Sequence, residues 1–157
     1  NRTSSMSRKW FDNKVPNNIN ISTENKLEKY AKNAVDNYIH NFNIYKLDLA
    51  ANEVLNLAIY TNLYLNDHQP WMLIKEKDTL PKVKEIIYNV LESTRIIGLL
   101  LLPLLPELSS KINEQLGLIY REEIPWKKQL CWGILVKNSS LPKPTPIINK
   151  LEYEKHL

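Results

Sequence analysis

The sequence has few of the residues that build catalytic and metal sites. Three glycines occur in 157 residues, and they stand alone at Gly98, Gly117 and Gly133, which excludes a glycine-rich phosphate-binding loop. The single cysteine, Cys131, cannot form an internal disulfide, and no cysteine–histidine spacing is typical of zinc. Beside Trp132, Cys131 is expected to be a small buried apolar group. The sequence therefore shows no set of catalytic residues. The absence of a disulfide pair is compatible with a reducing compartment.

Long apolar runs and arginine are also scarce. The longest apolar run, residues 96–105, is short for a membrane span and contains a proline, and no secretory signal is visible. We therefore expect no membrane contact. The net charge of +4 permits a polyanionic partner without requiring one. Arginine could contact such a partner at four positions only: Arg2, Arg8, Arg95 and Arg121.

The apolar residues that are present recur at helical spacing. They predict helices over residues 24–42, from Asp48 to about residue 66, from residues 79–81 to Pro103, and over residues 106–117. Ser22 or Thr23 and Asp48 are the expected N-caps. The chain also opens inside what reads as a helix and without methionine, which predicts a piece of a longer protein.

This pattern predicts an all-α fold. We expect an antiparallel helical bundle over residues 1–118, followed by an irregular C-terminal extension over residues 119–157. The extension lacks a periodic apolar face. It is expected to pack back on the bundle or toward a domain outside this sequence.

One segment, residues 58–75, combines a helix end with a rigid aromatic. The predicted helix stops at a polar run, and Pro70 then fixes φ and prevents a simple continuation. Trp71 follows at once. A flat ring beside a proline suits stacking on an unpaired RNA base. The alternative is that Trp71 only closes the end of the bundle.

The same segment carries a resemblance. Its pattern N-x-Y-L-N-D-x-x-P-W-x-L-x-K, over residues 62–75, resembles the signature of the anticodon-binding domain of methionyl-tRNA synthetases. Residues 1–3, 100–107 and 115–118 are similar to further pieces of that family, in the same order, closest to the bacterial and organellar type. The tail is less similar, because residues 146–150 replace a P-L-F-P-R-like segment with P-I-I-N-K.

The resemblance implies roles for particular residues. In that family the tryptophan after the proline, here Trp71 after Pro70, stacks on the first anticodon base, a cytosine. An arginine on the first bundle helix, here Arg2, helps to read the anticodon. The asparagine that assists it, four residues earlier, would fall before Asn1 and is absent. Three more polar residues lie near the same corner, either as base contacts or as solvated helix-end side chains: Asn62, Asn66 and His68.

The resemblance also implies a function. The full enzyme of this family joins methionine to its tRNA with ATP and magnesium, whereas this stretch would hold no cofactor and would recognise the anticodon loop of methionine tRNA. The expected partners are that tRNA and an N-terminal catalytic domain of the same chain. The protein is expected to be a monomer in the cytoplasm or in an organelle.

Two alternatives stay open at this point. One is the anticodon-binding domain of a related class I synthetase for leucine, isoleucine, valine or cysteine, which the joint presence of Arg2 and the Pro70–Trp71 pair disfavours. The other is a helical protein-interaction module whose exposed Trp71 anchors a peptide. If the domain recognises RNA, the side chains of Arg2 and Trp71 should lie at the same corner of the bundle. Trp71 should be accessible to solvent, and no carboxylate should form a bidentate ion pair with Arg2.

Overall fold

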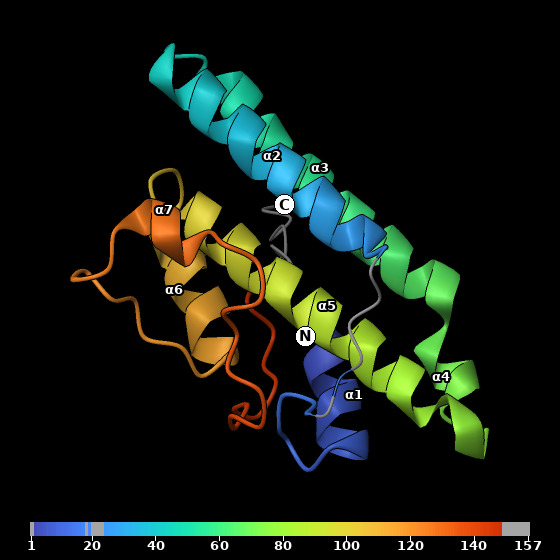
Figure 1. Cartoon of the computed structure of the whole chain (residues 1–157). Helices are drawn as coiled ribbons and strands as arrows, with labels where there is room; N and C mark the ends of the chain where they lie inside the picture. The colour runs from blue at the N-terminus through green and yellow to red at the C-terminus, as the bar shows by residue number, and fades with distance from the viewer. Residues whose placement is uncertain (1, 18, 20–23, 149–157) are drawn as a thin grey trace, which may run out of the picture.

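The computed structural model describes residues 2–17, 19 and 24–148, except for the side chain of Lys77. Within these ranges the chain forms helices and no strand (Figure 1). The helices are α1 (Arg2–Trp10), α2 (Lys26–Asn43), α3 (Leu47–His68), α4 (Pro70–Leu73), a 3-10 turn η1 (Lys77–Thr79), α5 (Leu80–Leu101), α6 (Pro106–Gln115) and α7 (Trp126–Gln129). The all-α prediction is confirmed. No helix in the described ranges is long and apolar enough to cross a membrane.

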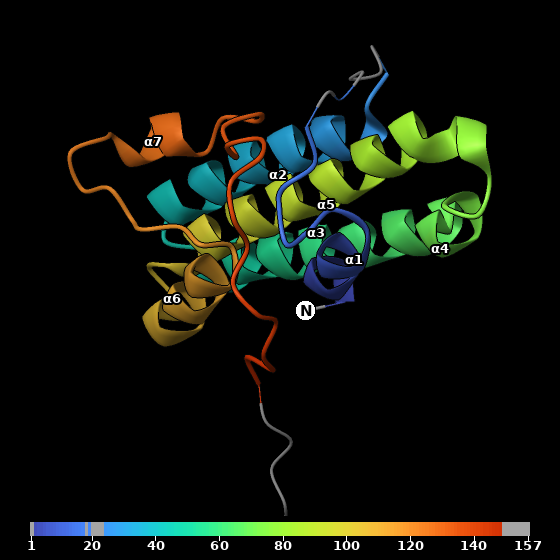
Figure 2. The same cartoon turned by 90° about the horizontal axis from the view of Figure 1, so that it is seen from below.

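Helix α5 is the centre of the bundle. Every residue from Glu85 to Leu100 is buried except the partly buried Thr94. The α2–α3 hairpin packs on one side of α5, while α1 and α6 pack on the other side (Figures 1 and 2). A helix that is apolar around most of its circumference belongs in the interior of a bundle. The predicted starts of α5 and α6 are confirmed. Pro81 lies in the first turn of α5 and Pro106 begins α6, positions where proline costs no helical hydrogen bond.

The caps of the α2–α3 hairpin differ from the sequence prediction. Asn25 caps α2, and its side-chain oxygen accepts a hydrogen bond from the backbone N–H of Glu28 at 3.2 Å. Ser22 and Thr23 lie outside the described residues. Asp48 does not cap α3, because the helix already begins at Leu47 and Asp48 lies in its first turn. There its carboxylate still faces the positive end of the helix dipole.

Helix α6 approaches α5 closely because a glycine faces it. A Cβ at Gly98 would lie 2.9 Å from Ile112 Cγ2, and Ser109 donates a 2.7 Å hydrogen bond to the Gly98 carbonyl. Gly117, directly after the C-cap residue Leu116, has φ of +66°, the left-handed conformation in which a glycine commonly ends a helix. A Cβ at Gly117 would lie 2.7 Å from the Ser140 carbonyl oxygen, so the C-terminal extension passes directly over this turn.

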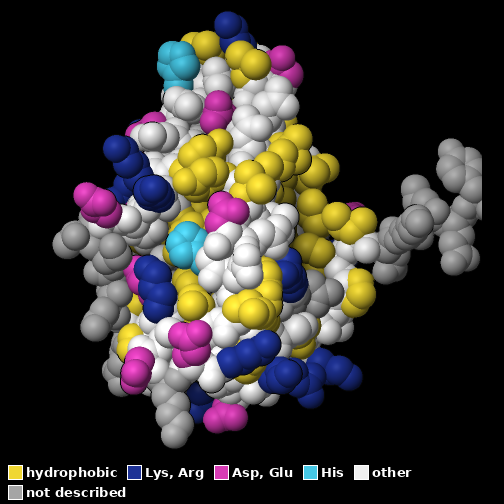
Figure 3. All heavy atoms as spheres, turned by 90° about the vertical axis from the view of Figure 1, so that its right-hand side faces the viewer, with side chains coloured by type: hydrophobic (Ala, Val, Ile, Leu, Met, Phe, Trp, Pro, Cys, Tyr) yellow, Lys and Arg dark blue, Asp and Glu magenta, His cyan; other side chains and the backbone are white. Residues whose placement is uncertain are grey.

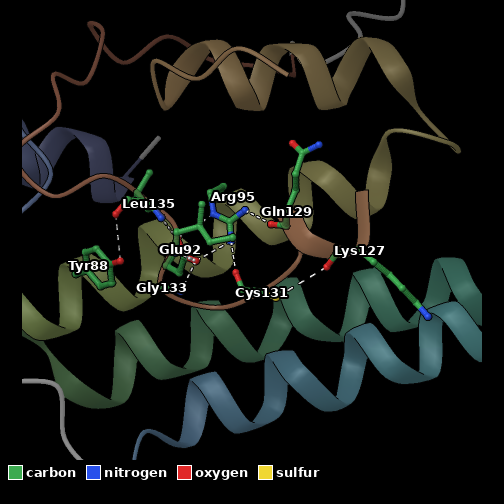
Figure 4. A network of polar contacts seen from close by, with 9 residues as sticks. Tyr88, Glu92, Arg95, Lys127, Gln129, Cys131, Gly133 and Leu135 are labelled. Atoms are coloured by element: carbon green, nitrogen blue, oxygen red, sulfur yellow. Dashed lines mark hydrogen bonds and ion pairs between the residues drawn. The ribbon is translucent and has the colours of Figure 1, made fainter. Parts of the chain in front are cut away.

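The extension is attached to α5 by a buried ion pair, shown in Figure 4. The Glu92 carboxylate accepts hydrogen bonds from Arg95 and from the backbone N–H groups of residues 133–135 at 2.7–3.1 Å. Arg95 also donates to the carbonyls of Gln129 and Cys131. Leu135, next to this network, is buried in the core with residues of α5 and α6. The described part of the extension thus packs on the bundle.

Two details of the extension contradict the expectations from sequence. It contains the short helix α7, which no apolar period announced. Cys131 is exposed, not buried, because its neighbour Trp132 takes the position against the core. The extension also pairs with the loop after α1: the Val15 N–H donates to the Ser139 carbonyl at 2.9 Å, and the Asn138 N–H donates to the Val15 carbonyl at 2.8 Å.

Candidate nucleic-acid interface

A tight turn between α3 and α4 presents Trp71. Gln69 ends α3 in the left-handed conformation, with φ of +42°, and its N–H still donates to the Leu65 carbonyl. Pro70 occupies the first position of α4, where its missing N–H costs no hydrogen bond. Pro70 is buried, and Trp71 beside it is partly buried. The turn therefore holds the indole in one place at the end of the bundle.

Helix α1 brings Arg2 to the same corner. The Arg2 guanidinium carbon lies 4.3 Å from the centroid of a Trp71 ring, within the range of a cation–π contact. Arg2 Nη1 also donates a 2.8 Å hydrogen bond to Asn66 Oδ1 on α3. Arg2 is exposed, and none of the ion pairs in the described part of the chain involves it. The predicted meeting of Arg2 and Trp71 on one corner is confirmed.

The surface around this corner carries charges of both signs. Figure 3 views the molecule from the side of α4 and shows Lys and Arg side chains mixed with Asp and Glu. Proteins that bind nucleic acid mainly through phosphates present a continuous basic surface. This face instead suits recognition by stacking and a few directed hydrogen bonds.

The remaining predicted site residues separate into two faces of α3. Asn62 and Asn66 lie one helical turn apart on the outer face, where Asn62 is exposed. His68 lies on another face of α3. The centroid of its ring lies 4.1 Å from the centroid of the Tyr64 ring, and its Nδ1 lies 2.8 Å from the Tyr64 carbonyl oxygen. The structure therefore brings Arg2, Asn66 and Trp71 together and does not bring His68 into that contact.

His68 lines a separate cavity of about 360 Å³ between α2, α3 and α5. Tyr64 lies beside it, and the Tyr64 hydroxyl accepts a 3.1 Å hydrogen bond from Asn89. Burial raises the pKa of Tyr64, although the hydrogen bond from Asn89 opposes that shift. The phenol is therefore neutral at physiological pH.

In the described ranges no group of three or more His, Cys, Asp or Glu residues could hold a metal ion.

Comparison with known proteins agrees with this geometry. Residues 15–156 match the family model of the anticodon-binding domain of methionyl-tRNA ligase. The chain belongs to this family. The match also favours this family over the related class I synthetases. The match to the family model begins at residue 15. It therefore does not include α1, which carries Arg2.

Curated relatives cover nearly the whole domain. It is 33% identical over 159 aligned residues to a methionine–tRNA ligase of Thermosynechococcus vestitus, covering 96% of this chain and 30% of the relative. It is 30% identical to the methionine–tRNA ligase of Nostoc sp., covering 100% of this chain, α1 included, and 31% of the relative. The chain thus spans about a third of the length of these curated relatives.

Solved structures share the fold. The apo form of Mycobacterium tuberculosis methionyl-tRNA synthetase superposes with a TM-score of 0.83 at 24% identity, covering 98% of this chain and 31% of that one. The same synthetase bound by methionyl-adenylate superposes with a TM-score of 0.82 at 26% identity, covering 93% of this chain and 29% of that one.

The roles of the arginines in the domain could not be predicted from the sequence. Arg95 is only 4% exposed, and its pair with Glu92 occupies it, so it is not available to RNA. Sequence reasoning also placed Asn66 near the corner without foreseeing that it holds Arg2. The two residues lie 64 positions apart, and no local pattern signals such a contact.

Proposed function

We propose that this domain binds the anticodon loop of methionine tRNA at the corner formed by Arg2, Asn66 and Trp71. The observation that carries the proposal is the contact of the Arg2 guanidinium with the Trp71 ring at 4.3 Å, with Arg2 held by Asn66. A flat ring for stacking and a planar donor for base edges thus lie side by side on an exposed corner. Unpaired RNA bases are recognised by this combination.

The chemistry of the corner suits cytosine as the first anticodon base. A guanidinium has five N–H donors, and in Arg2 one of them is donated to Asn66. The others match the two neighbouring acceptors, O2 and N3, on the Watson–Crick edge of cytosine. The base would stack on the part of the indole that the guanidinium leaves uncovered. Asn62 lies one turn away on the same face of α3 and can offer its amide to a neighbouring base.

The whole protein is proposed to be a methionine–tRNA ligase. Supporting this, the relatives that match nearly all of this chain carry that name and are about three times as long. An N-terminal catalytic domain would use ATP and magnesium to activate methionine, and this domain would select the tRNA. We expect the ligase to be a monomer that works in the cytoplasm or in an organelle.

The proposal is tested with a synthetic anticodon stem–loop of methionine tRNA and a second stem–loop in which the first anticodon cytosine is replaced by guanine. The replaced base presents a donor where cytosine presents an acceptor, so we expect binding to weaken at least about tenfold. Fluorescence anisotropy at a fixed salt concentration measures both affinities, because salt alone changes RNA binding strongly. Equal affinity for the two stem–loops would refute anticodon recognition by this domain.

A further inference from the structure

A second cavity lies far from the Arg2–Trp71 corner. It is an open hollow with a volume of about 200 Å³, bordered by α5, α6, α7, the loop between α6 and α7, and residues 134–136. Helices α7 and α4 lie at opposite ends of the molecule in both views (Figures 1 and 2). The residues that line it are Arg95, Leu99, Asn113, Leu118, Ile119, Tyr120, Arg121, Ile124, Lys128, Gln129, Ile134 and Val136.

The lining is mostly apolar, and apolar side chains continue onto the rim. Ile119 is 89% exposed, Val136 is 64% exposed and Ile134 is 46% exposed, although all three border the cavity. Clustered exposed apolar residues around a hollow mark an interaction site. An apolar cavity of about 150 Å³ is enough for a benzene ring. The hollow therefore accommodates one large apolar side chain, and its rim offers contact to the neighbouring residues of a longer ligand.

All the charged residues that line the cavity are cationic. Arg121 and Lys128 are exposed at the rim, and neither has a side-chain ion pair in the described ranges. Arg95, at the floor, is neutralised by Glu92. No carboxylate is among the residues that line the cavity. Two uncompensated cations beside an apolar hollow favour a ligand that carries carboxylates next to its apolar group.

The floor contains a polar side chain, Asn113. It lines the cavity and is 8% exposed, and its amide atoms are not among the buried side-chain atoms that lack a hydrogen-bond partner. Its backbone carbonyl accepts from the N–H groups of Leu116 and Leu118 at the end of α6. An amide or carbonyl of a bound ligand can hydrogen-bond to the Asn113 side chain.

We propose that this cavity binds an acidic peptide segment through one large apolar side chain. The apolar side chain fills the hollow, carboxylates on either side pair with Arg121 and Lys128, and a backbone group of the peptide hydrogen-bonds to Asn113. The ligand is a peptide and not a small molecule, because the apolar rim extends beyond a hollow that one ring already fills. This site is separate from the proposed anticodon site and does not depend on it.

The test uses the 157-residue chain and an acetylated pentapeptide with one phenylalanine between two pairs of glutamates. Amide chemical shifts recorded during a titration with the peptide should change at residues 118–121 and 134–136. Reversing both cations, with R121E and K128E together, should weaken binding about tenfold, the size expected for two exposed ion pairs. V136D should also weaken binding, and K29E, a charge reversal at an exposed lysine on α2, should leave it unchanged.

Further binding measurements use the unaltered protein, so their results do not depend on whether the variants fold. Peptides with alanine in place of the phenylalanine, or lysines in place of the glutamates, should bind at least about tenfold more weakly. An anticodon stem–loop of methionine tRNA should not displace the bound peptide. The proposal is overturned if no peptide binds, if the lysine or alanine peptides bind equally well, if the shifts map to another surface, or if the RNA competes.

Discussion

The indole of Trp71 belongs to both the core and the surface. It packs against the buried cluster of the bundle, and Arg2 lies over it from outside. Closing the bundle and offering a stacking surface, first weighed as alternatives, are therefore compatible. The buried part of the ring fixes its orientation, which lowers the entropy lost when a base stacks on the rest.

Replacing this ring should affect binding and stability together. Trp71→Ala removes one base–aromatic stack, so we expect tRNA stem–loop binding to weaken by ~1–3 kcal/mol. Because the ring is partly buried, the free energy of unfolding should also fall, by about 1–3 kcal/mol. Anisotropy and chemical denaturation measure the two effects. A loss of stability with unchanged RNA affinity would mean that Trp71 only closes the bundle.

Asn66 should act through Arg2. Asn66→Ala removes the acceptor of the 2.8 Å hydrogen bond and frees the guanidinium from its position over Trp71. We expect stem–loop binding to weaken by about 0.5–1.5 kcal/mol. Asn56→Ala is the matched control, since it removes the same group from an exposed position on the same helix, away from the corner. Equal losses in both variants would show that Asn66 contributes no more than an exposed asparagine elsewhere on α3 and that positioning Arg2 is not its role.

At the scale of elements, Glu92 connects the bundle and the extension. It is fully buried, and its two oxygens accept from Arg95 and from three consecutive backbone N–H groups of the extension (Figure 4). A buried carboxylate survives only with such partners. Helix α5 therefore supplies both the core of the bundle and the attachment of the extension.

Removing this carboxylate should be severely destabilising. Glu92→Ala leaves Arg95 buried without its counter-charge, so the free energy of unfolding should fall by about 3–5 kcal/mol. Glu28→Ala breaks a surface pair with Lys32 and should cost at most about 1 kcal/mol. Denaturant titration compares the two. A loss for Glu92→Ala as small as that for Glu28→Ala would contradict the role of the network.

The extension should also show two levels of protection in hydrogen exchange. The amide of Leu135 donates to Glu92 and should exchange slowly, whereas residues 119–123 donate no backbone hydrogen bond within the described chain and should exchange fast. Because of this network, only part of the extension should have low stability. Uniformly fast exchange from residue 118 onward would contradict this prediction.

The elements that sequence predicted are those with a local signal. Apolar periodicity located α2, α3, α5 and α6, and the prolines gave the starts of α5 and α6. The turn before Trp71 followed from the polar run at residues 66–69 and from Pro70. The contact of Glu92 with residues 133–135 joins positions more than 40 apart, and no periodicity marks it. Helix α7 is too short for a period, so it was not predicted.

At the scale of the whole molecule, the chain should bind RNA without catalysing the reaction of its relatives. It spans about a third of the length of the methionine–tRNA ligases to which it is similar, and it matches their anticodon-binding domain. We expect no methionine-dependent pyrophosphate exchange by the 157-residue chain, with a full-length methionine–tRNA ligase as the positive control. Exchange that copurifies with the chain and is lost only when the chain is removed would contradict this prediction.

Two buried tyrosines should make the free energy of unfolding depend on pH in alkaline solution. Burial raises the pKa of Tyr38 to about 12, and burial, with a smaller contribution from Glu92, raises the pKa of Tyr88 to about 12. Tyr88 donates a hydrogen bond to the Leu135 carbonyl, whereas the Tyr38 hydroxyl has no partner in the described ranges. An unfolded chain would release both protons near the ordinary tyrosine pKa of about 10.

Stability should therefore be lost as pH rises from about 10 to about 12. In that interval the unfolded chain releases phenol protons that the folded chain keeps, so each tyrosine lowers the free energy of unfolding by up to about 2–3 kcal/mol. Tyr38→Phe separates this effect from packing, because it removes only the unpartnered hydroxyl. It should leave stability at pH 7 unchanged or higher and make the alkaline loss smaller, as measured by urea denaturation at stepwise pH. Tyr45→Phe, at a 91% exposed position, is the control that should change neither quantity. If the Tyr38→Phe and unaltered chains lost stability in parallel above pH 10, Tyr38 would not be a buried neutral phenol.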